Sequence, residues 1–94
     1  MNVVVIDDTP VMLLRLERLV QTLAGCKVIP FSCALDALAW CDRHEPDLLI
    51  VDYLLPDMSG LDLVQRLRES SRHVEVPVII VTQDHDRGVR RFAL

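Results

Sequence analysis

The stretch that decides the fold is LLIVDYLLPDMSG, residues 48–60. Its first four residues are apolar, as in a strand that is buried on both faces of a sheet. The run then ends on Asp52, a carboxylate, which is among the most costly groups to bury. Pro56 and Gly60 follow as turn residues. Packing alone does not explain a carboxylate at the end of a buried strand, so Asp52 is a candidate functional residue.

Three other short runs have the composition of strands. They are apolar and mostly β-branched, and they lie at residues 2–6, 27–31 and 78–81. Lys27 and Pro30 make the second of them suitable for the edge of a sheet.

Helical patterns alternate with these strands. The spacing predicts helices that open after Thr9, after Ser32, near Ser59 and at Asp84. In the second helix we expect Leu35, Leu38 and Ala39 to face inward, and in the fourth Val89, Phe92 and Ala93 to share one face. The alternation predicts a single α/β domain over residues 1–94, a three-layer αβα open parallel sheet with helices on both faces.

Composition excludes several classes of protein. A formal charge of −4 disfavours a nucleic-acid surface, and no apolar run approaches the ~20 residues of a membrane span. The N-terminus has no basic region, so we expect a cytoplasmic protein rather than a secreted one. The three cysteines contain no C-x-x-C, which indicates neither a disulfide framework nor a zinc site.

Acidic residues follow two of the predicted strands, where ligands bind in parallel sheets. Asp7 and Asp8 end the first strand, Asp52 ends the third, and Thr82 ends the fourth. If the first and third strands are neighbours, the three carboxylates meet and repel, by about 4 kcal/mol per pair at ~4 Å. A bound cation relieves this repulsion, and hard oxygen ligands suit Mg²⁺. The alternative is that the acids only cap helices, which fits Asp8 best.

In this order and spacing, the motifs resemble the receiver domain of bacterial two-component response regulators. They are the acidic pair after the first strand, D-Y-L-L-P-D-M-S-G after the third and P-V-I-I-V-T at the fourth. The resemblance covers the whole chain. It implies a flavodoxin-like strand order of 2-1-3-4, with the family's fifth strand and fifth helix missing, as in a C-terminally truncated domain.

The resemblance also implies roles for individual residues. Asp52 would accept a phosphoryl group from a histidine kinase or a phosphotransfer protein. Asp8, Asp52 and the backbone carbonyl of Leu54 would bind Mg²⁺, and Asp7 would act through a metal-bound water. Thr82 would hydrogen-bond the phosphoryl oxygen and serve as the switch. Such a module is not an enzyme beyond its own phosphorylation and dephosphorylation, and it controls an output domain in a longer parent protein.

Two departures from the family pattern keep an alternative open. Gln83 stands where the family usually has a small residue, and the lysine that ends the family's fifth strand is missing, since Lys27 is the only lysine. The chain would then be a receiver-like interaction or dimerisation module that is not competent for phosphorylation. A third candidate, a phosphatase of the haloacid dehalogenase type, is disfavoured because Asp7 and Asp8 are contiguous rather than spaced as D-x-D.

The remaining expectations concern surfaces. Without a fifth strand, residues 78–81 would be an open apolar edge, so we expect a homodimer through strand 4 and helix 4. We interpret Asp84, His85 and Asp86 as a helix cap rather than a metal cluster. We expect His44 and His73 to be solvated, together with a helix face formed by Arg87, Arg90 and Arg91.

Overall fold

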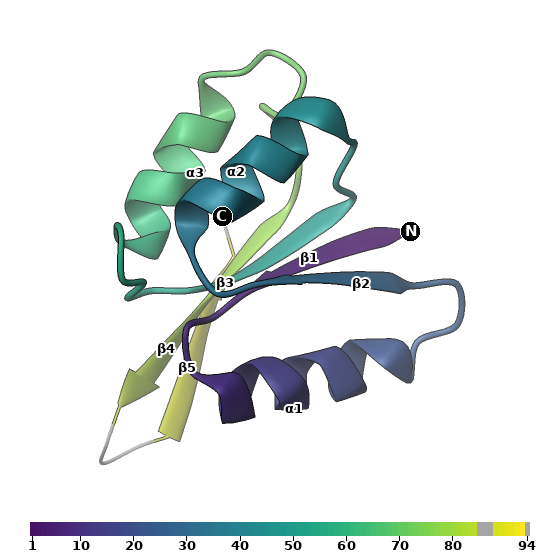
Figure 1. Ribbon diagram of the computed structural model, residues 1–94, viewed down its shortest axis with the longest axis vertical. Coiled ribbons are helices and arrows are strands. Elements are labelled where there is room, and N and C mark those ends of the chain that lie inside the picture. Colours follow the sequence, from purple (N-terminus) through teal and green to yellow (C-terminus); the bar gives the residue numbers. More distant parts are fainter. Residues whose placement is uncertain (85–87, 94) are drawn as a thin grey trace.

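The computed structural model describes residues 1–84 and 88–93, with side chains described as far as Thr82. Five strands form one sheet and three helices cover it (Figure 1). In chain order the elements are β1 (Asn2–Ile6), α1 (Pro10–Gln21), β2 (Lys27–Phe31), α2 (Ala34–Arg43), β3 (Leu48–Asp52), α3 (Gly60–Arg68), β4 (Val78–Asp84) and β5 (Gly88–Ala93).

The first four strands are parallel and lie in the order β2-β1-β3-β4, as predicted, with β2 at an edge. The register aligns their carboxyl ends: Ile6 lies opposite Val51, and Asp52 lies opposite Val81. Asp7, directly after β1, and Asp52, at the end of β3, therefore reach the same rim of the sheet.

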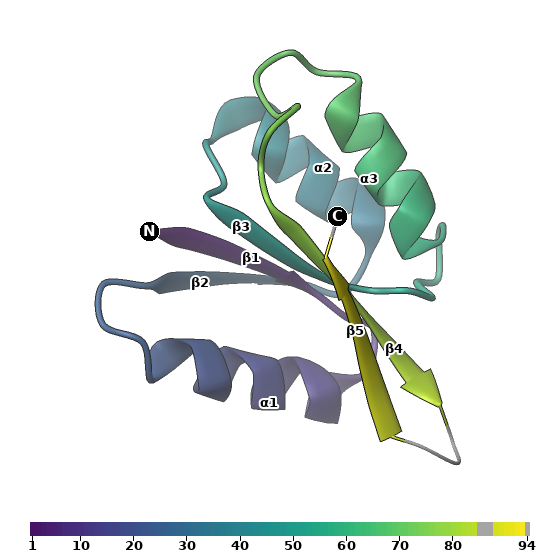
Figure 2. The ribbon, with the colours of Figure 1, turned by 180° about the vertical axis from the view of Figure 1, so that it is seen from behind.

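The two faces of the sheet are covered unequally (Figures 1 and 2). Helices α2 and α3 lie side by side on one face, whereas α1 lies alone on the other. The larger core cluster joins α2 and α3 to the sheet, and the smaller one consists of Val3, Val5, Leu16 and Val20. On the α1 side, an apolar groove of about 280 Å³ runs between the helix and the strands β3 and β4. The three-layer prediction is confirmed, with one layer only partly filled.

The predicted fourth helix is wrong. Residues Gly88–Ala93 form β5, which pairs antiparallel with β4 from Ile79 to Asp84. Asp84 ends a strand instead of capping a helix, and β4 continues past the predicted end at Val81. The physical reason is that the edge of β4 exposes a row of unpaired N–H and C=O groups, which a following β-prone segment can satisfy. Gly88 also disfavours a helix.

The homodimer through strand 4 and helix 4 stays a prediction, but the open strand edge and the helix on which it was based are not found among the described residues. In the described part of the chain the edge of β4 is already paired with β5, and helix 4 does not form. Arg90 and Arg91 lie in β5 rather than on a helix face. Arg87 and the acid–histidine pair His85 and Asp86 lie outside the described residues.

The prediction that His73 is solvated is also wrong. Its side chain is 2% exposed, and its Nε2 lies 2.7 Å from the carbonyl oxygen of Cys41 in α2. Arg68 donates to the carbonyl of His73, and Arg72 donates to that of Asp42 and forms an ion pair with Glu45. These contacts fix the connection between α3 and β4 against the end of α2.

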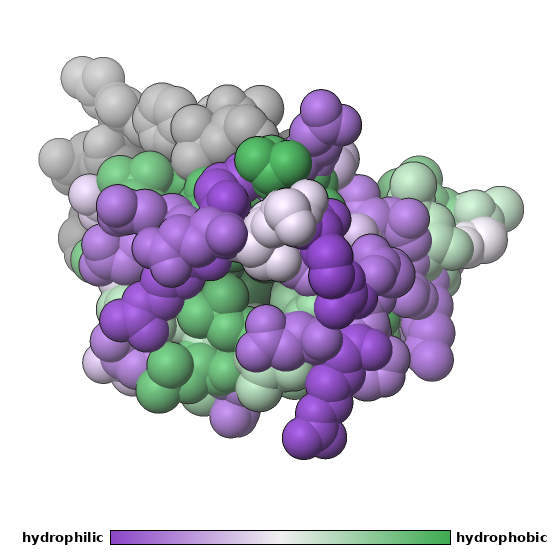
Figure 3. Space-filling view, turned by 90° about the horizontal axis from the view of Figure 1, so that it is seen from above, coloured by the Kyte–Doolittle hydropathy of each residue, from purple (hydrophilic) through white to green (hydrophobic). Residues whose placement is uncertain are grey.

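The surface above α2 and α3 is mostly hydrophilic, with apolar patches near its middle (Figure 3).

Among the described helices, none combines the length and apolar character needed to cross a bilayer.

Candidate functional site

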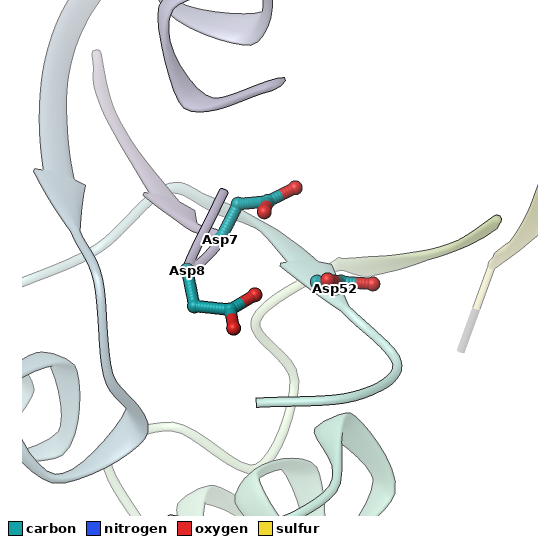
Figure 4. A group of neighbouring side chains, drawn as sticks. All are labelled: Asp7, Asp8 and Asp52. Atoms are coloured by element: carbon teal, nitrogen blue, oxygen red, sulfur yellow. The ribbon is translucent and has the colours of Figure 1, made fainter. Parts of the chain in front are cut away.

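Three carboxylates converge at the carboxyl edge of the sheet (Figure 4). Asp7 and Asp8 follow β1, Asp52 ends β3, and one ligand oxygen from each lies within 4.8 Å of the other two. The prediction that these three residues meet is confirmed. Within the described residues this is the one group of three or more metal-ligating side chains at such spacing.

Asp7 is the buried member of the cluster, only 2% exposed. Its Oδ1 accepts a hydrogen bond of 2.9 Å from the N–H of Thr9, and its own N–H donates to the carbonyl of Phe31 at 3.0 Å. Burial raises the pKa of the Asp7 carboxyl, as does the charge of Asp8, while the hydrogen bonds from Thr9 lower it. The carboxylate is thus held in place with one oxygen already partnered.

Asp52 carries the strongest perturbation of the three. The pKa of its carboxyl is raised from 3.8 to about 6, most by burial, then by the negative charge of Asp7 and, less strongly, by that of Asp8. The backbone N–H groups of Leu54 and Tyr53 act in the opposite direction. A carboxylate that resists ionisation because of its neighbours is one that a cation would stabilise.

The other predicted site residues are Thr82 in β4 and Leu54 in the loop after β3. Thr82 lies on β4, one residue beyond Val81, the residue opposite Asp52, and it is half-buried. The Leu54 side chain is 69% exposed, so a role for this residue in the site falls to its backbone. Lys27 lies opposite Asn2, at the start of the sheet and at the far end from the cluster.

The loop after Asp52 is held closely against the end of β3. The N–H of Gly60 donates to the carbonyl of Tyr53 at 2.6 Å, and a Cβ at Gly60 would lie 2.6 Å from the Asp52 carbonyl oxygen. Ser59 and Asp62 form a capping box at the start of α3, which confirms that this helix opens near Ser59.

The sequence reasoning missed Asp57. Its carboxylate accepts hydrogen bonds from the N–H groups of Ala34 at 3.0 Å and Leu35 at 2.8 Å, so it caps α2 from another part of the chain. Ser32, the predicted cap, lies one residue too early. The residue at the N-cap position is Cys33, which makes no capping hydrogen bond with its side chain. The one local signal in the sequence was that Asp57 follows Pro56, a pair typical of turns. That pattern predicts a turn, but it does not predict a hydrogen bond to a helix 23 residues away.

The donor set has a clear chemical preference. All three ligands are carboxylate oxygens on neighbouring strand ends, and hard oxygen ligands favour Mg²⁺ over softer metals. Burial raises the pKa values of Asp7 and Asp52 most, and repulsion from neighbouring carboxylates raises them further; a cation would offset that repulsion. The residues present therefore fit a divalent cation.

Comparison with known proteins places this chain in a family. Residues 3–94 match the model of the response regulator receiver domain. The chain is 37% identical over 95 residues to the cyclic di-GMP phosphodiesterase response regulator RpfG of Xanthomonas campestris, covering 100% of this chain and 25% of that protein. It is 40% identical over 92 residues to the transcriptional regulatory protein KdpE of Mycobacterium tuberculosis, covering 98% of this chain and 39% of that protein.

Solved structures agree with this placement. The chemotaxis response regulator CheY4 of Vibrio cholerae superposes with a TM-score of 0.82 at 25% identity, over 89% of this chain and 69% of that one. The signal receiver domain of an HD domain-containing protein from Pseudomonas fluorescens superposes with a TM-score of 0.79 at 28% identity. The match covers 90% of this chain and 60% of that one. The chain spans between a quarter and two-fifths of the length of the two curated relatives above. The chain belongs to the receiver domain family of two-component response regulators.

Proposed function

We propose that this receiver domain accepts a phosphoryl group from a histidine kinase or a phosphotransfer protein onto Asp52, with Mg²⁺ bound beside it. The observation that carries the proposal is the convergence of Asp7, Asp8 and Asp52 within 4.8 Å at the rim of the sheet. In the transfer, a carboxylate oxygen of Asp52 forms a bond to phosphorus as the bond from phosphorus to the donor nitrogen breaks.

Each residue has a defined part in this proposal. Asp8, Asp52 and the Leu54 carbonyl would hold the cation directly, and Asp7 would hold it through water. When bound, Mg²⁺ supplies positive charge that offsets the carboxylates and the incoming phosphoryl oxygens. Thr82, next to the Asp52 partner on β4, would donate its hydroxyl to a phosphoryl oxygen and so report the modification. The domain would act in the cytoplasm on an output domain of a longer protein.

A second candidate rests on a specific observation. Lys27 is the only lysine of the sequence and lies at the opposite end of the sheet from the cluster. A site without a lysine that pairs with the phosphoryl group would be poorly phosphorylated, and the chain would act as an interaction module instead. Incubation with Mg²⁺ and a small acyl-phosphate donor, followed by intact mass measurement, separates the two. A phosphoryl adduct that maps to Asp52 supports the first candidate, and its absence supports the second.

Mg²⁺ should raise the midpoint of thermal unfolding, because a ligand that binds only the folded state stabilises it. At ten times its Kd the gain is about 1.4 kcal/mol, or roughly 5 °C or more for a domain of this size. Differential scanning calorimetry with and without millimolar Mg²⁺ measures it. Asp8→Asn should abolish the rise, whereas Asp62→Asn, on α3 outside the cluster, should keep it. A midpoint that does not move in the wild-type protein contradicts the metal site.

A further inference from the structure

The loop between β3 and α3 is attached to a helix that is distant in sequence. Both carboxylate oxygens of Asp57 accept backbone hydrogen bonds, one from Ala34 and one from Leu35, at the first turn of α2. The residue that should cap α2, Cys33, makes no such bond with its side chain. Asp57 therefore satisfies N–H groups that α2 itself leaves without a side-chain cap.

This attachment continues to the other half of the acidic cluster. The carbonyl of Phe31, at the end of β2, accepts the N–H of Asp7 at 3.0 Å. The short connection from Phe31 to α2 is thus bonded to Asp7 on one side and to Asp57 on the other. Since Asp57 comes five residues after Asp52, the two halves of the cluster are joined through the start of α2 as well as through the sheet.

Besides Asp57, the loop is held at its ends and by Leu55 and Met58, which pack against the larger core cluster. The N–H of Tyr53 donates to the carbonyl of Val81 at 2.9 Å, next to the strand. The capping box of Ser59 and Asp62 fixes the start of α3, the element that the loop enters. Between these ends, a 3.2 Å hydrogen bond from the N–H of Leu55 to the carbonyl of Met58 closes a turn. Asp57 lies within that turn and bonds it to α2.

The charge state of Asp57 suits this task. Partial burial raises the pKa of its carboxyl, but the hydrogen bonds from Ala34 and Leu35 outweigh burial, so the pKa lies below its ordinary value. A carboxylate at a helix N-terminus also interacts favourably with the helix dipole.

We propose that Asp57 is a positioning residue for the acidic site. By capping α2 it holds the turn after Asp52, so that the Leu54 carbonyl would be available to a bound cation. This inference rests on the proposed function, in which Leu54 contributes a carbonyl ligand. Groups that orient metal ligands without touching the metal commonly change metal affinity by about 10-fold or more when they are replaced.

The test compares three variants at a temperature where circular dichroism shows each to be folded. Asp57→Ala should weaken Mg²⁺ binding, measured by isothermal titration calorimetry, by about 10-fold. Asp57→Asn should lose less than Asp57→Ala, because the amide keeps one acceptor oxygen for one of the two backbone N–H groups and replaces the other oxygen by an NH2 donor. Asp47→Ala is the matched control: it removes a carboxylate that accepts the N–H of Asn2 at the opposite end of the sheet, and it should leave the affinity unchanged. Equal losses in Asp57→Ala and Asp47→Ala, or no loss in Asp57→Ala, would overturn the proposal.

Amide hydrogen exchange without Mg²⁺ separates this inference from the proposed function. Asp57→Ala should speed exchange at Leu55, whose own hydrogen bond lies inside the turn, while exchange at Asp62 stays as in the wild type. If the wild type binds no Mg²⁺, the proposed function fails and the exchange result alone decides the role of Asp57. Unchanged exchange at Leu55 then means that Asp57 does not hold the turn.

Discussion

Replacing Asp52 with asparagine should stabilise the metal-free protein at pH 7 by about 2 kcal/mol, after allowance for solvent screening of a half-buried group. Burial and the neighbouring charge of Asp7 raise the pKa of Asp52 from 3.8 to about 6 in the folded protein. The folded state therefore binds this proton more tightly than the unfolded state does. The stability that the proton contributes is fully present below pH 3.8 and is lost as the pH rises through 6.

Urea unfolding of the wild type and Asp52→Asn between pH 4 and pH 8 measures this effect. The difference in the free energy of unfolding should be small at pH 4 and should reach a plateau above pH 7. Asp42→Asn, at an exposed acid of α2 outside the cluster, is the control variant. In Mg²⁺ at ten times its Kd the advantage of Asp52→Asn should shrink to about 0.6 kcal/mol, because only the wild type keeps its full set of ligands. A difference that stays constant across the pH range would mean that Asp52 is not strained by its neighbours.

The same variant should lose phosphorylation completely, because asparagine has no carboxylate to attack phosphorus. Intact mass after incubation with the acyl-phosphate donor should show no adduct.

The parallel sheet and its acidic rim could be predicted because each depends on a local pattern. Short apolar runs specify strands that are buried on both faces, and the residue that follows each run falls at the carboxyl edge. The resemblance supplied the strand order that makes β1 and β3 neighbours. That order brings Asp7 and Asp8 to Asp52, and no local pattern specifies it.

Helix α2 shows where periodicity fails. The sequence predicted that Leu35 faces inward, yet its side chain is 54% exposed, and the fully buried positions are Ala34, Ala37 and Cys41. Apolar residues surround most of this helix, so hydrophobic spacing alone does not select one face. The small side chains face the sheet, where helix and strand approach closely. Asp57 was missed because its partners, the N–H groups of Ala34 and Leu35, lie far away along the chain. Strand β5 was missed because it pairs with backbone groups of β4, which have no sequence signature.

Gly60 shows how closely the loop after Asp52 approaches the strand that carries it. A Cβ at this position would lie 2.6 Å from the Asp52 carbonyl oxygen and 3.3 Å from Tyr53 Cα, and both are backbone atoms. The φ of Gly60 is not positive, so the need for glycine is one of space. Gly25 is the opposite case: its φ is +80°, with nothing within 4 Å of an added Cβ.

Gly60→Ala should therefore destabilise the fold by about 3 kcal/mol, as overpacking against a rigid neighbour does. Gly25→Ala, the control, should cost only about 1 kcal/mol, the strain of a side chain in the left-handed region. The two also differ at the site. An added methyl group at Gly60 pushes the loop away from Asp52, so the rise in thermal midpoint with Mg²⁺ should fall in Gly60→Ala and persist in Gly25→Ala. Urea unfolding and calorimetry of the two variants measure both effects. Equal behaviour of the two alanines would mean that the loop yields without disturbing Asp52, and that the close approach at Gly60 is not what holds the site together.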